Sequence, residues 1–174
     1  MNKDGHVLNA ILLSLGLGVI LSLNPMRAIT TADAVPTLGS IAALSIPVVL
    51  GALFPDVDTA FGRHRKTLHN LPVLAIFLVW PYYFGNLHFV WIGVATHYVL
   101  DVVGSRRGIA LFYPLSDQEY GLPTGVATSS DYAAHVTVAV TVLELSLLAV
   151  VHYYVFALDA GLPQAVQAVQ ALGL

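Results

Sequence analysis

The 174-residue sequence contains no cysteine, and only 10% of its residues are charged. The absence of cysteine excludes disulfide bonds and any metal site built on thiolates, although it leaves the redox compartment open. Soluble domains carry about 25% charged residues, so the scarcity of charge places this chain in the membrane-protein class. Its formal net charge of −3 also excludes the basic surface of a protein that binds nucleic acid.

Apolar residues are abundant instead: they make up 57% of the chain and are gathered in five runs. A helix needs about 20 apolar residues to cross the hydrocarbon core of a bilayer. The sequence therefore predicts an all-α, polytopic integral membrane protein, with about five transmembrane helices in a single domain. The predicted spans cover residues 7–23, 37–54, 71–84, 87–103 and 133–158.

The basic residues are distributed unevenly over the loops of this topology. Of the 7 lysines and arginines, only Arg27 falls on the side opposite the N-terminus. The others are Lys3, Arg63, Arg65, Lys66, Arg106 and Arg107. Because basic loops stay on the non-translocated side, we predict a multi-pass protein of the cytoplasmic membrane whose N-terminus is cytoplasmic. The sequence carries no signal of an oligomeric state.

The same topology gathers histidines and aspartates at the cytoplasmic face. They are His6, Asp56, Asp58, His69, His97 and Asp101. His97 and Asp101 are four residues apart in a predicted helix, so they share one face. Imidazole and carboxylate groups without sulfur suit Zn²⁺, Mn²⁺ or Fe²⁺. We therefore predict a divalent metal site at this face, with zinc as the first candidate and manganese or iron as alternatives.

Two electrostatic costs favour a bound cation. An aspartate at the centre of a membrane helix costs about 2.5–3.5 kcal/mol, and less near a helix end, where Asp101 lies. Asp56 and Asp58 are two residues apart, and carboxylates about 6 Å apart repel by about 3 kcal/mol at an effective dielectric constant near 20. A metal ion between such groups reverses the sign of that interaction.

Each of these residues also has an explanation without a metal. Asp56 or Asp58 could cap the turn after Pro55. His97 and Asp101 could form a hydrogen-bonded pair, and His6 and His69 could be ordinary residues of the membrane interface. We interpret the other four histidines as structural or solvated: they are His64, His88, His135 and His152. Glu144 lies in the middle of the fifth span, and the sequence identifies no partner for it.

Several stretches resemble the YdjM-type membrane-bound metal-dependent hydrolases, a family described as LexA-regulated inner-membrane proteins. The stretches are "GALFPDVD", "HRKTLHN" and "THYVLDVVGSRRGIALFYPLSDQEYGLP". The matching positions are His6, Pro55–Asp58, His64–His69, His97 with Asp101, and Gly108 with Pro114 and Leu115. The resemblance covers roughly residues 5–125, and it departs from the family pattern at Asn70, where serine is usual.

The resemblance implies a helical membrane protein with a divalent metal site. It further implies a distant similarity to zinc-dependent phospholipase C and P1-type nucleases, and hence a phosphoester substrate such as a lipid head group. We therefore predict a hydrolase that uses metal-activated water at the cytoplasmic face, with Asp58 and His97 as the catalytic residues. The arginines predicted to bind an anionic head group are Arg63, Arg65, Arg106 and Arg107.

Two other functions stay open from the sequence. One is a structural or stress-response membrane protein in which the metal only clamps the helices. The other is an ion-coupled transporter, which would need a polar path through the spans. Toward the far side the sequence offers only Glu144, His88 and His152 for such a path.

Overall fold

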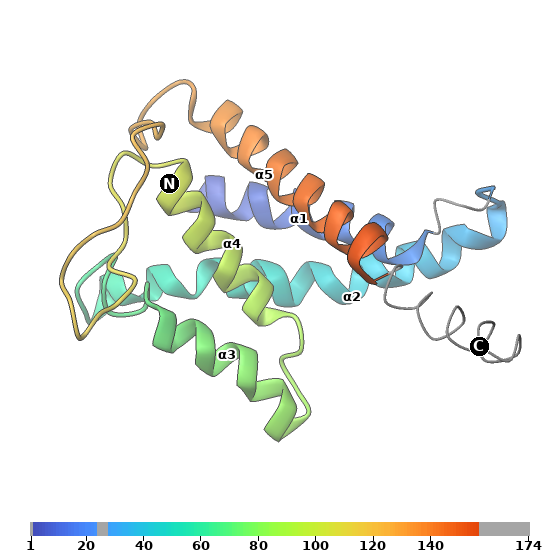
Figure 1. Ribbon diagram of the computed structural model, residues 1–174, viewed down its shortest axis with the longest axis horizontal. Helices are drawn as coiled ribbons and strands as arrows, with labels where there is room; N and C mark the ends of the chain where they lie inside the picture. The colour runs from blue at the N-terminus through green and yellow to red at the C-terminus, as the bar shows by residue number, and fades with distance from the viewer. Residues whose placement is uncertain (1, 24–27, 157–174) are drawn as a thin grey trace, which may run out of the picture.

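The computed structural model describes residues 2–23 and 28–156, which form five α-helices (Figure 1). In chain order these are α1 (Lys3–Ser22), α2 (Ala34–Leu53), α3 (Leu71–Phe84), α4 (Val90–Val103) and α5 (Ala133–Val150). A π-helical turn, Val151–Phe156, follows α5. Within the described ranges, two isolated bridges, Ser105–Val126 and Ile109–Tyr120, are the β-type pairings. The all-α fold predicted from the apolar runs is confirmed.

The helices fall into two length classes. Three apolar segments are long enough to cross a bilayer: Lys3–Ser22, Thr31–Ala60 and Ala133–Tyr154. In contrast, α3 and α4 have 14 residues each, fewer than the roughly 20 that a full span needs. The predicted span 71–84 coincides with α3, whereas α4 begins three residues after the predicted start at 87. The predicted end of the fifth span, residue 158, lies outside the described residues.

The late start of α4 follows from the turn that precedes it. Gly85 ends α3 in the left-handed conformation, with φ 65°, which glycine adopts without steric cost. Leu87 also has a positive φ, 59°, so the chain is still turning at that residue. Hydrophobicity alone does not show this, because Leu87 and Phe89 in the turn are as apolar as the helix that follows.

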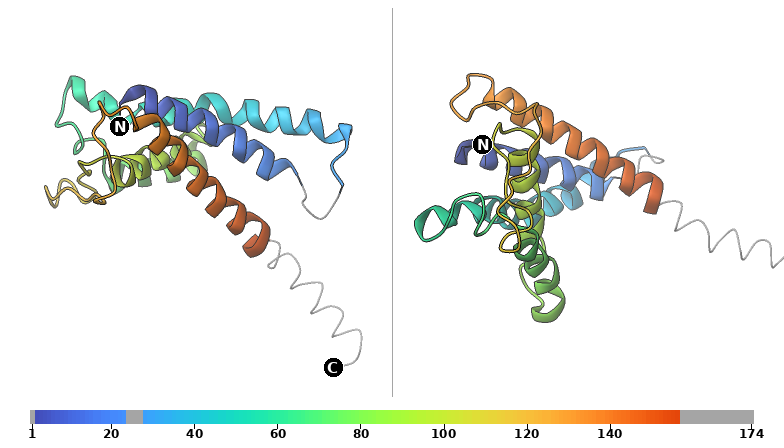
Figure 2. Two further views of the ribbon diagram at one scale, coloured as in Figure 1. Left: turned by 90° about the horizontal axis from the view of Figure 1, so that it is seen from above. Right: turned by 60° about the vertical axis from the view of Figure 1, so that its left-hand side comes forward.

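Helices α1, α2 and α4 pack tightly together. One buried apolar cluster joins α1 to α2 and contains Ala10, Leu13, Leu17, Leu44, Val48 and Ala52. Between α2 and α4 the backbones nearly touch at two glycines: a Cβ on Gly51 would lie 2.0 Å from the Val90 carbonyl oxygen. A Cβ on Gly93 would lie 2.0 Å from the Val48 carbonyl oxygen. Helix α3 buries no residue and diverges from the other helices (Figures 1 and 2).

The long loops gather at the end of the molecule where α1 begins (Figure 1). One is the α2–α3 connection, which starts with the 3-10 helix η2 (Pro55–Ala60). The other is the α4–α5 connection. The Ala110 amide donates to the Arg65 carbonyl, and the Leu71 amide donates to the Leu111 carbonyl, both at 2.9 Å. These bonds hold the two loops together above the helix ends.

Candidate metal centre

The six predicted metal ligands come together beneath these loops, and all of them are buried. His6 comes from α1, and His97 with Asp101 from α4. Asp56 and Asp58 come from η2. His69 precedes α3, and its place is fixed by Asn70, whose side chain caps α3 by accepting from the Val73 amide at 3.1 Å. Buried ionisable groups in such number require partners or a cation.

The imidazoles of His69 and His97 have well-defined hydrogen-bond roles. His97 Nδ1 lies 2.6 Å from the carbonyl oxygen of Ala52, to which it can only donate. His69 Nδ1 lies 3.0 Å from Asp58 Oδ2, which accepts its proton. Burial, followed by the proximity of His97, lowers the pKa of His69 to about 4, so this ring is neutral at pH 7. Both rings therefore present an Nε2 lone pair.

Those two Nε2 atoms lie 3.0 Å apart. Two lone pairs at this distance repel unless a proton or a metal ion lies between them. Asp56 Oδ1 lies 3.7 Å from His69 Nε2 and 3.8 Å from His97 Nε2. Asp101 Oδ2 lies 3.8 Å and 3.6 Å from the same two nitrogens. A tetrahedral zinc ion with ligands at about 2.0–2.2 Å holds its donor atoms roughly 3.3–3.6 Å apart. The nitrogen–oxygen distances of 3.6–3.8 Å lie at or just above this range, and the nitrogen–nitrogen distance of 3.0 Å lies just below it, so small side-chain shifts would place these donors around an ion.

His6 has a different environment. Its ring is stacked on that of His97, with centroids 3.6 Å apart and an interplanar angle of 9°. Both of its ring nitrogens are buried without a hydrogen-bond partner, although Nε2 lies 3.5 Å from Asp101 Oδ1. A buried polar atom without a partner costs about 1–3 kcal/mol. A metal bound by His6 would remove this cost, since one atom each of His6, His97 and Asp101 lies within 4.8 Å of the others.

Asp58 lies behind the histidines rather than among the converging donors. Its Oδ1 is 3.0 Å from His64 Nδ1, and its Oδ2 is 3.0 Å from His69 Nδ1. Oδ2 also accepts from the Leu68 amide at 3.3 Å. A carboxylate on the far nitrogen of a metal-binding imidazole fixes its tautomer and orientation. The structure thus gives Asp58 an orienting position, whereas the sequence predicted a ligand and catalytic residue.

His64 lies beside the centre, which its interpretation as structural or solvated does not include. Its side chain is 41% exposed, and its Nδ1 lies 3.0 Å from Asp58 Oδ1 and 3.9 Å from Asp56 Oδ1. It forms a second possible ligand group with Asp56 and His69. The signal in the sequence was its place at the start of "HRKTLHN". The chain folds back there because Arg65 adopts a positive φ of 68°.

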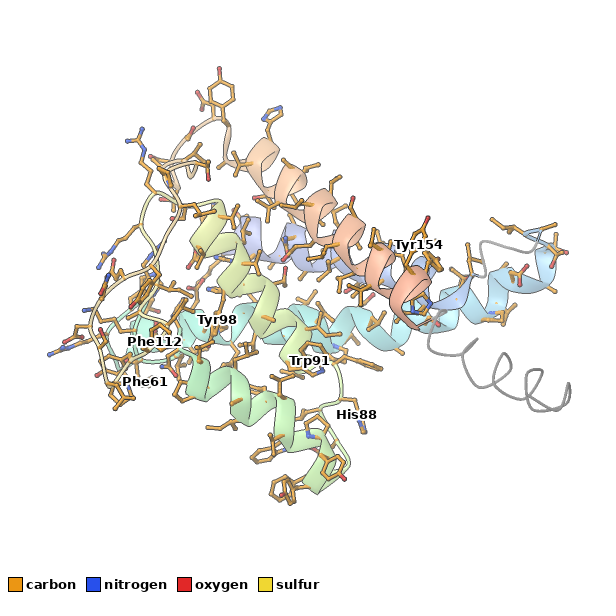
Figure 3. All side chains as sticks on the ribbon, in the orientation of Figure 1. Phe61, His88, Trp91, Tyr98, Phe112 and Tyr154 are labelled. Atoms are coloured by element: carbon orange, nitrogen blue, oxygen red, sulfur yellow. The ribbon has the colours of Figure 1, made fainter. Side chains whose placement is uncertain are left out.

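The other three histidines lie elsewhere. His88 belongs to the α3–α4 turn, where its Nε2 is 3.1 Å from the Gly85 carbonyl oxygen. His135 is exposed on α5, and His152 stacks edge-on against Tyr153 beyond α5. Figure 3 shows His88 at the opposite end of α4 from the loops.

The four predicted anion-binding arginines occupy different environments. Arg65 is buried. Its guanidinium donates to the carbonyl oxygens of Arg107 and Gly108 and to Ser105 Oγ. Its Nη2 also lies 3.7 Å from Asp101 Oδ1. It therefore anchors the α4–α5 loop and balances the charge of Asp101, instead of facing a head group.

The other arginines lie outside the centre. Arg107 pairs with Glu119 at 2.8 Å, and this hydrogen bond raises the pKa of Arg107 and lowers that of Glu119. The side chain of Arg63 is 71% exposed, 3.8 Å from Asp117, and Arg106 is exposed as well. Of the four, Arg63 and Arg106 are the ones placed to meet an anion in solution or at a membrane surface.

The conserved pattern of one protein family matches the chain over almost its whole length. The family is described as the YdjM inner membrane protein family, and the match covers residues 1–165. The chain belongs to this family. The resemblance noted in the sequence is thereby confirmed, and the apolar helices accord with an inner-membrane location. Neither a curated protein nor a solved structure matches this YdjM-family chain.

Proposed function

We propose that this YdjM-family protein is a membrane-embedded, metal-dependent hydrolase that acts on a phosphoester such as a lipid head group. The observation that carries the proposal is the pair of Nε2 lone pairs of His69 and His97, 3.0 Å apart and flanked by oxygens of Asp56 and Asp101. Zinc is the first candidate for this donor set, and manganese or iron are the alternatives.

The chain's own residues suggest how such a site would work. A divalent metal, when bound, would lower the pKa of a bound water to near neutral, and the metal would itself polarise a phosphoryl oxygen of the substrate. Asp58 holds the rings of His64 and His69 in one tautomer through its two oxygens. Because Nδ1 of His64 donates inward to Asp58, its Nε2 keeps a lone pair on the exposed side, where it can accept a proton from the attacking water and then pass that proton to the departing alkoxide. This side of the centre is also the natural entrance for a substrate.

Exposed apolar side chains favour a lipid substrate. Phe61, Phe112 and Leu115 are 66%, 47% and 93% exposed, and all three belong to the loops above the centre. Figure 3 shows Phe61 and Phe112 at the same end of the molecule. Apolar side chains of this kind lie favourably in the boundary between head groups and acyl chains. The guanidinium of Arg63 or Arg106 matches the geometry of a phosphate group.

The test begins with metal content. Detergent-purified protein is expected to hold near-stoichiometric zinc, manganese or iron, and His97→Ala is expected to lose it. Ser146→Ala is the matched control, because Ser146 is exposed on α5 and bonds to its own helix. The metal-loaded protein is then incubated with vesicles of anionic phospholipid, and release of the head group is measured. A wild-type protein without metal after supplementation would refute the proposal.

A metal clamp is the second candidate. It is favoured because the donors come from α1, η2 and α4 and most of them are fully buried, so that an ion would tie three elements together. A clamp predicts that chelation lowers the melting temperature while no phosphoester is hydrolysed. The hydrolase predicts that His64→Ala keeps the metal but loses turnover, which separates the two functions.

A further inference from the structure

A second polar cluster lies inside the apolar part of the molecule, apart from the metal centre. It joins Asn9 of α1, Thr96 of α4, and Thr141 with Glu144 of α5. Glu144 is the only Asp, Glu, Lys or Arg between residues 133 and 156. It follows Ala133 by eleven residues, so it lies roughly 17 Å along a helix with a rise of 1.5 Å per residue. This places it near the middle of a hydrocarbon core about 30 Å thick.

The contacts of this cluster form a closed ring. Thr96 Oγ1 lies 2.6 Å from Glu144 Oε1 and also 2.6 Å from Asn9 Oδ1. Asn9 Nδ2 lies 2.9 Å from Glu144 Oε2 and 3.1 Å from Thr141 Oγ1. The Thr141 hydroxyl donates onward to the Thr137 carbonyl at 2.8 Å.

Counting protons in the ring shows that one is missing if Glu144 is ionised. The Asn9 amide uses its two protons on Glu144 Oε2 and Thr141 Oγ1. Thr96 has one hydroxyl proton for two oxygen partners at 2.6 Å, and neither a carboxylate oxygen nor an amide oxygen can donate. With an ionised Glu144, one of these contacts would bring two acceptors together without a proton between them.

We propose that Glu144 is a neutral, protonated carboxylic acid that closes this ring and thereby sets the positions of α1 and α4. Its O–H donates to Thr96, Thr96 donates to Asn9, and Asn9 donates back to Glu144. Every contact then has one proton. A neutral acid also avoids the cost of a charge in the bilayer interior, where the hydrogen-bonded partners of Glu144 are uncharged side chains.

The ring is linked by the backbone to the metal centre. Asn9 follows His6 by three residues on α1, and Thr96 directly precedes His97 on α4. Fixing Asn9 against Thr96 therefore fixes the ring of His6 against the ring of His97 and the carboxylate of Asp101. Glu144 is therefore a positioning residue for the centre. This role rests on the proposed metal-dependent function, whereas the protonation of Glu144 is independent of that function.

Infrared spectroscopy of the protein in lipid nanodiscs at pH 7 tests the protonation directly. The spectrum of the wild type minus that of Glu144→Gln is expected to show the carbonyl band of a protonated carboxylic acid. A carboxylate band in its place would overturn the proposal. Glutamine is the matched substitution, because its amide donates to Thr96 and accepts from Asn9 as the neutral acid does.

Metal affinity tests the positioning role, with Co²⁺ as a visible-spectrum probe. Glu144→Gln is expected to bind Co²⁺ within about threefold of the wild type, and Glu144→Leu and Thr96→Val about tenfold more weakly, as for other supports of metal ligands. Ser146→Ala on the same helix is expected to match the wild type. Wild-type affinity in Thr96→Val, or equal weakening by glutamine and leucine at position 144, would overturn the role. If the wild type itself binds no metal, the proposed function fails while the infrared result still decides the state of Glu144.

Discussion

At the residue scale, Asp58 shows how a buried carboxylate can hold the histidines of a candidate metal centre without lying among its converging donors. Its two oxygens hold His64 and His69 through their Nδ1 atoms, so the lone pairs of these rings are directed by Asp58. The same principle acts on His97 through the Ala52 carbonyl. In each case the group behind the imidazole decides which nitrogen is available.

Replacing Asp58 by alanine is therefore expected to weaken metal binding without removing a ligand. The expected loss is about 10–100-fold in affinity, since the histidine tautomers are no longer fixed. Competition with a fluorescent zinc chelator measures this. Asp117→Ala is the control, because Asp117 lies on the surface, where it pairs with Lys66. Equal affinities in the wild type and Asp58→Ala would contradict the orienting role.

Replacing Arg65 by alanine is expected to lower the free energy of unfolding by about 3 kcal/mol, because it leaves the buried oxygen atoms that accept from its guanidinium without a donor. These are the carbonyl oxygens of Arg107 and Gly108 and the hydroxyl oxygen of Ser105. Arg63→Ala changes an exposed side chain and is expected to cost about 0.5 kcal/mol or less. Denaturation in detergent compares the two variants. Equal stabilities would show that Arg65 is not a structural residue.

At the scale of the elements, the closest packing lies between α2 and α4. Gly51 and Gly93 let the two backbones meet, and in the same region the Ala52 carbonyl of α2 holds His97 of α4. The position of the His97 ring thus depends on the lack of a side chain at Gly51 and at Gly93. Each helix is predicted by its own apolar sequence, whereas the close contact of α2 with α4 arises only when the two helices pack together.

Gly93→Ala is expected to destabilise the fold by about 1–3 kcal/mol, the usual cost of overpacking. The added Cβ would lie 2.0 Å from the Val48 carbonyl oxygen and 2.5 Å from the Ala52 nitrogen, so α2 and α4 must separate. Gly39→Ala is the matched control, because a Cβ there meets nothing within 4 Å. Thermal unfolding in detergent measures both. A Gly93→Ala variant as stable as Gly39→Ala would show that the contact is looser than described.

At the scale of the whole molecule, the long loops, the candidate ligands and most of the basic residues belong to the same end. The N-terminal end of α1 and both long loops lie at one end, together with the candidate metal centre, while the C-terminal end of α1 and the start of α2 lie at the other (Figures 1 and 2). The surplus of basic residues belongs to the first end. The positive-inside rule therefore predicts that this end faces the cytoplasm.

The absence of cysteine makes this orientation easy to test. Ser116→Cys, in the α4–α5 loop, is expected to react with a membrane-impermeant maleimide in inside-out vesicles but not in intact spheroplasts. Ala28→Cys, exposed at the other end, is expected to show the opposite pattern. The cysteine-free parent chain controls for background labelling. A reversed pattern would place the metal centre outside the cytoplasm.

The sequence by itself determined the membrane class, the all-α fold, the approximate helix ranges and the identities of the six histidines and aspartates that come together beneath the loops. These follow from local properties: mean hydropathy over a run, and the four-residue spacing of His97 and Asp101 on one helix. The tertiary structure decided that Asp58 orients, that His64 joins the centre, that Arg65 turns inward and that Glu144 meets Asn9 and Thr96. Each of these depends on which atoms lie within about 3–4 Å across elements distant in the chain, and interactions of such short range leave no periodic signal in the sequence.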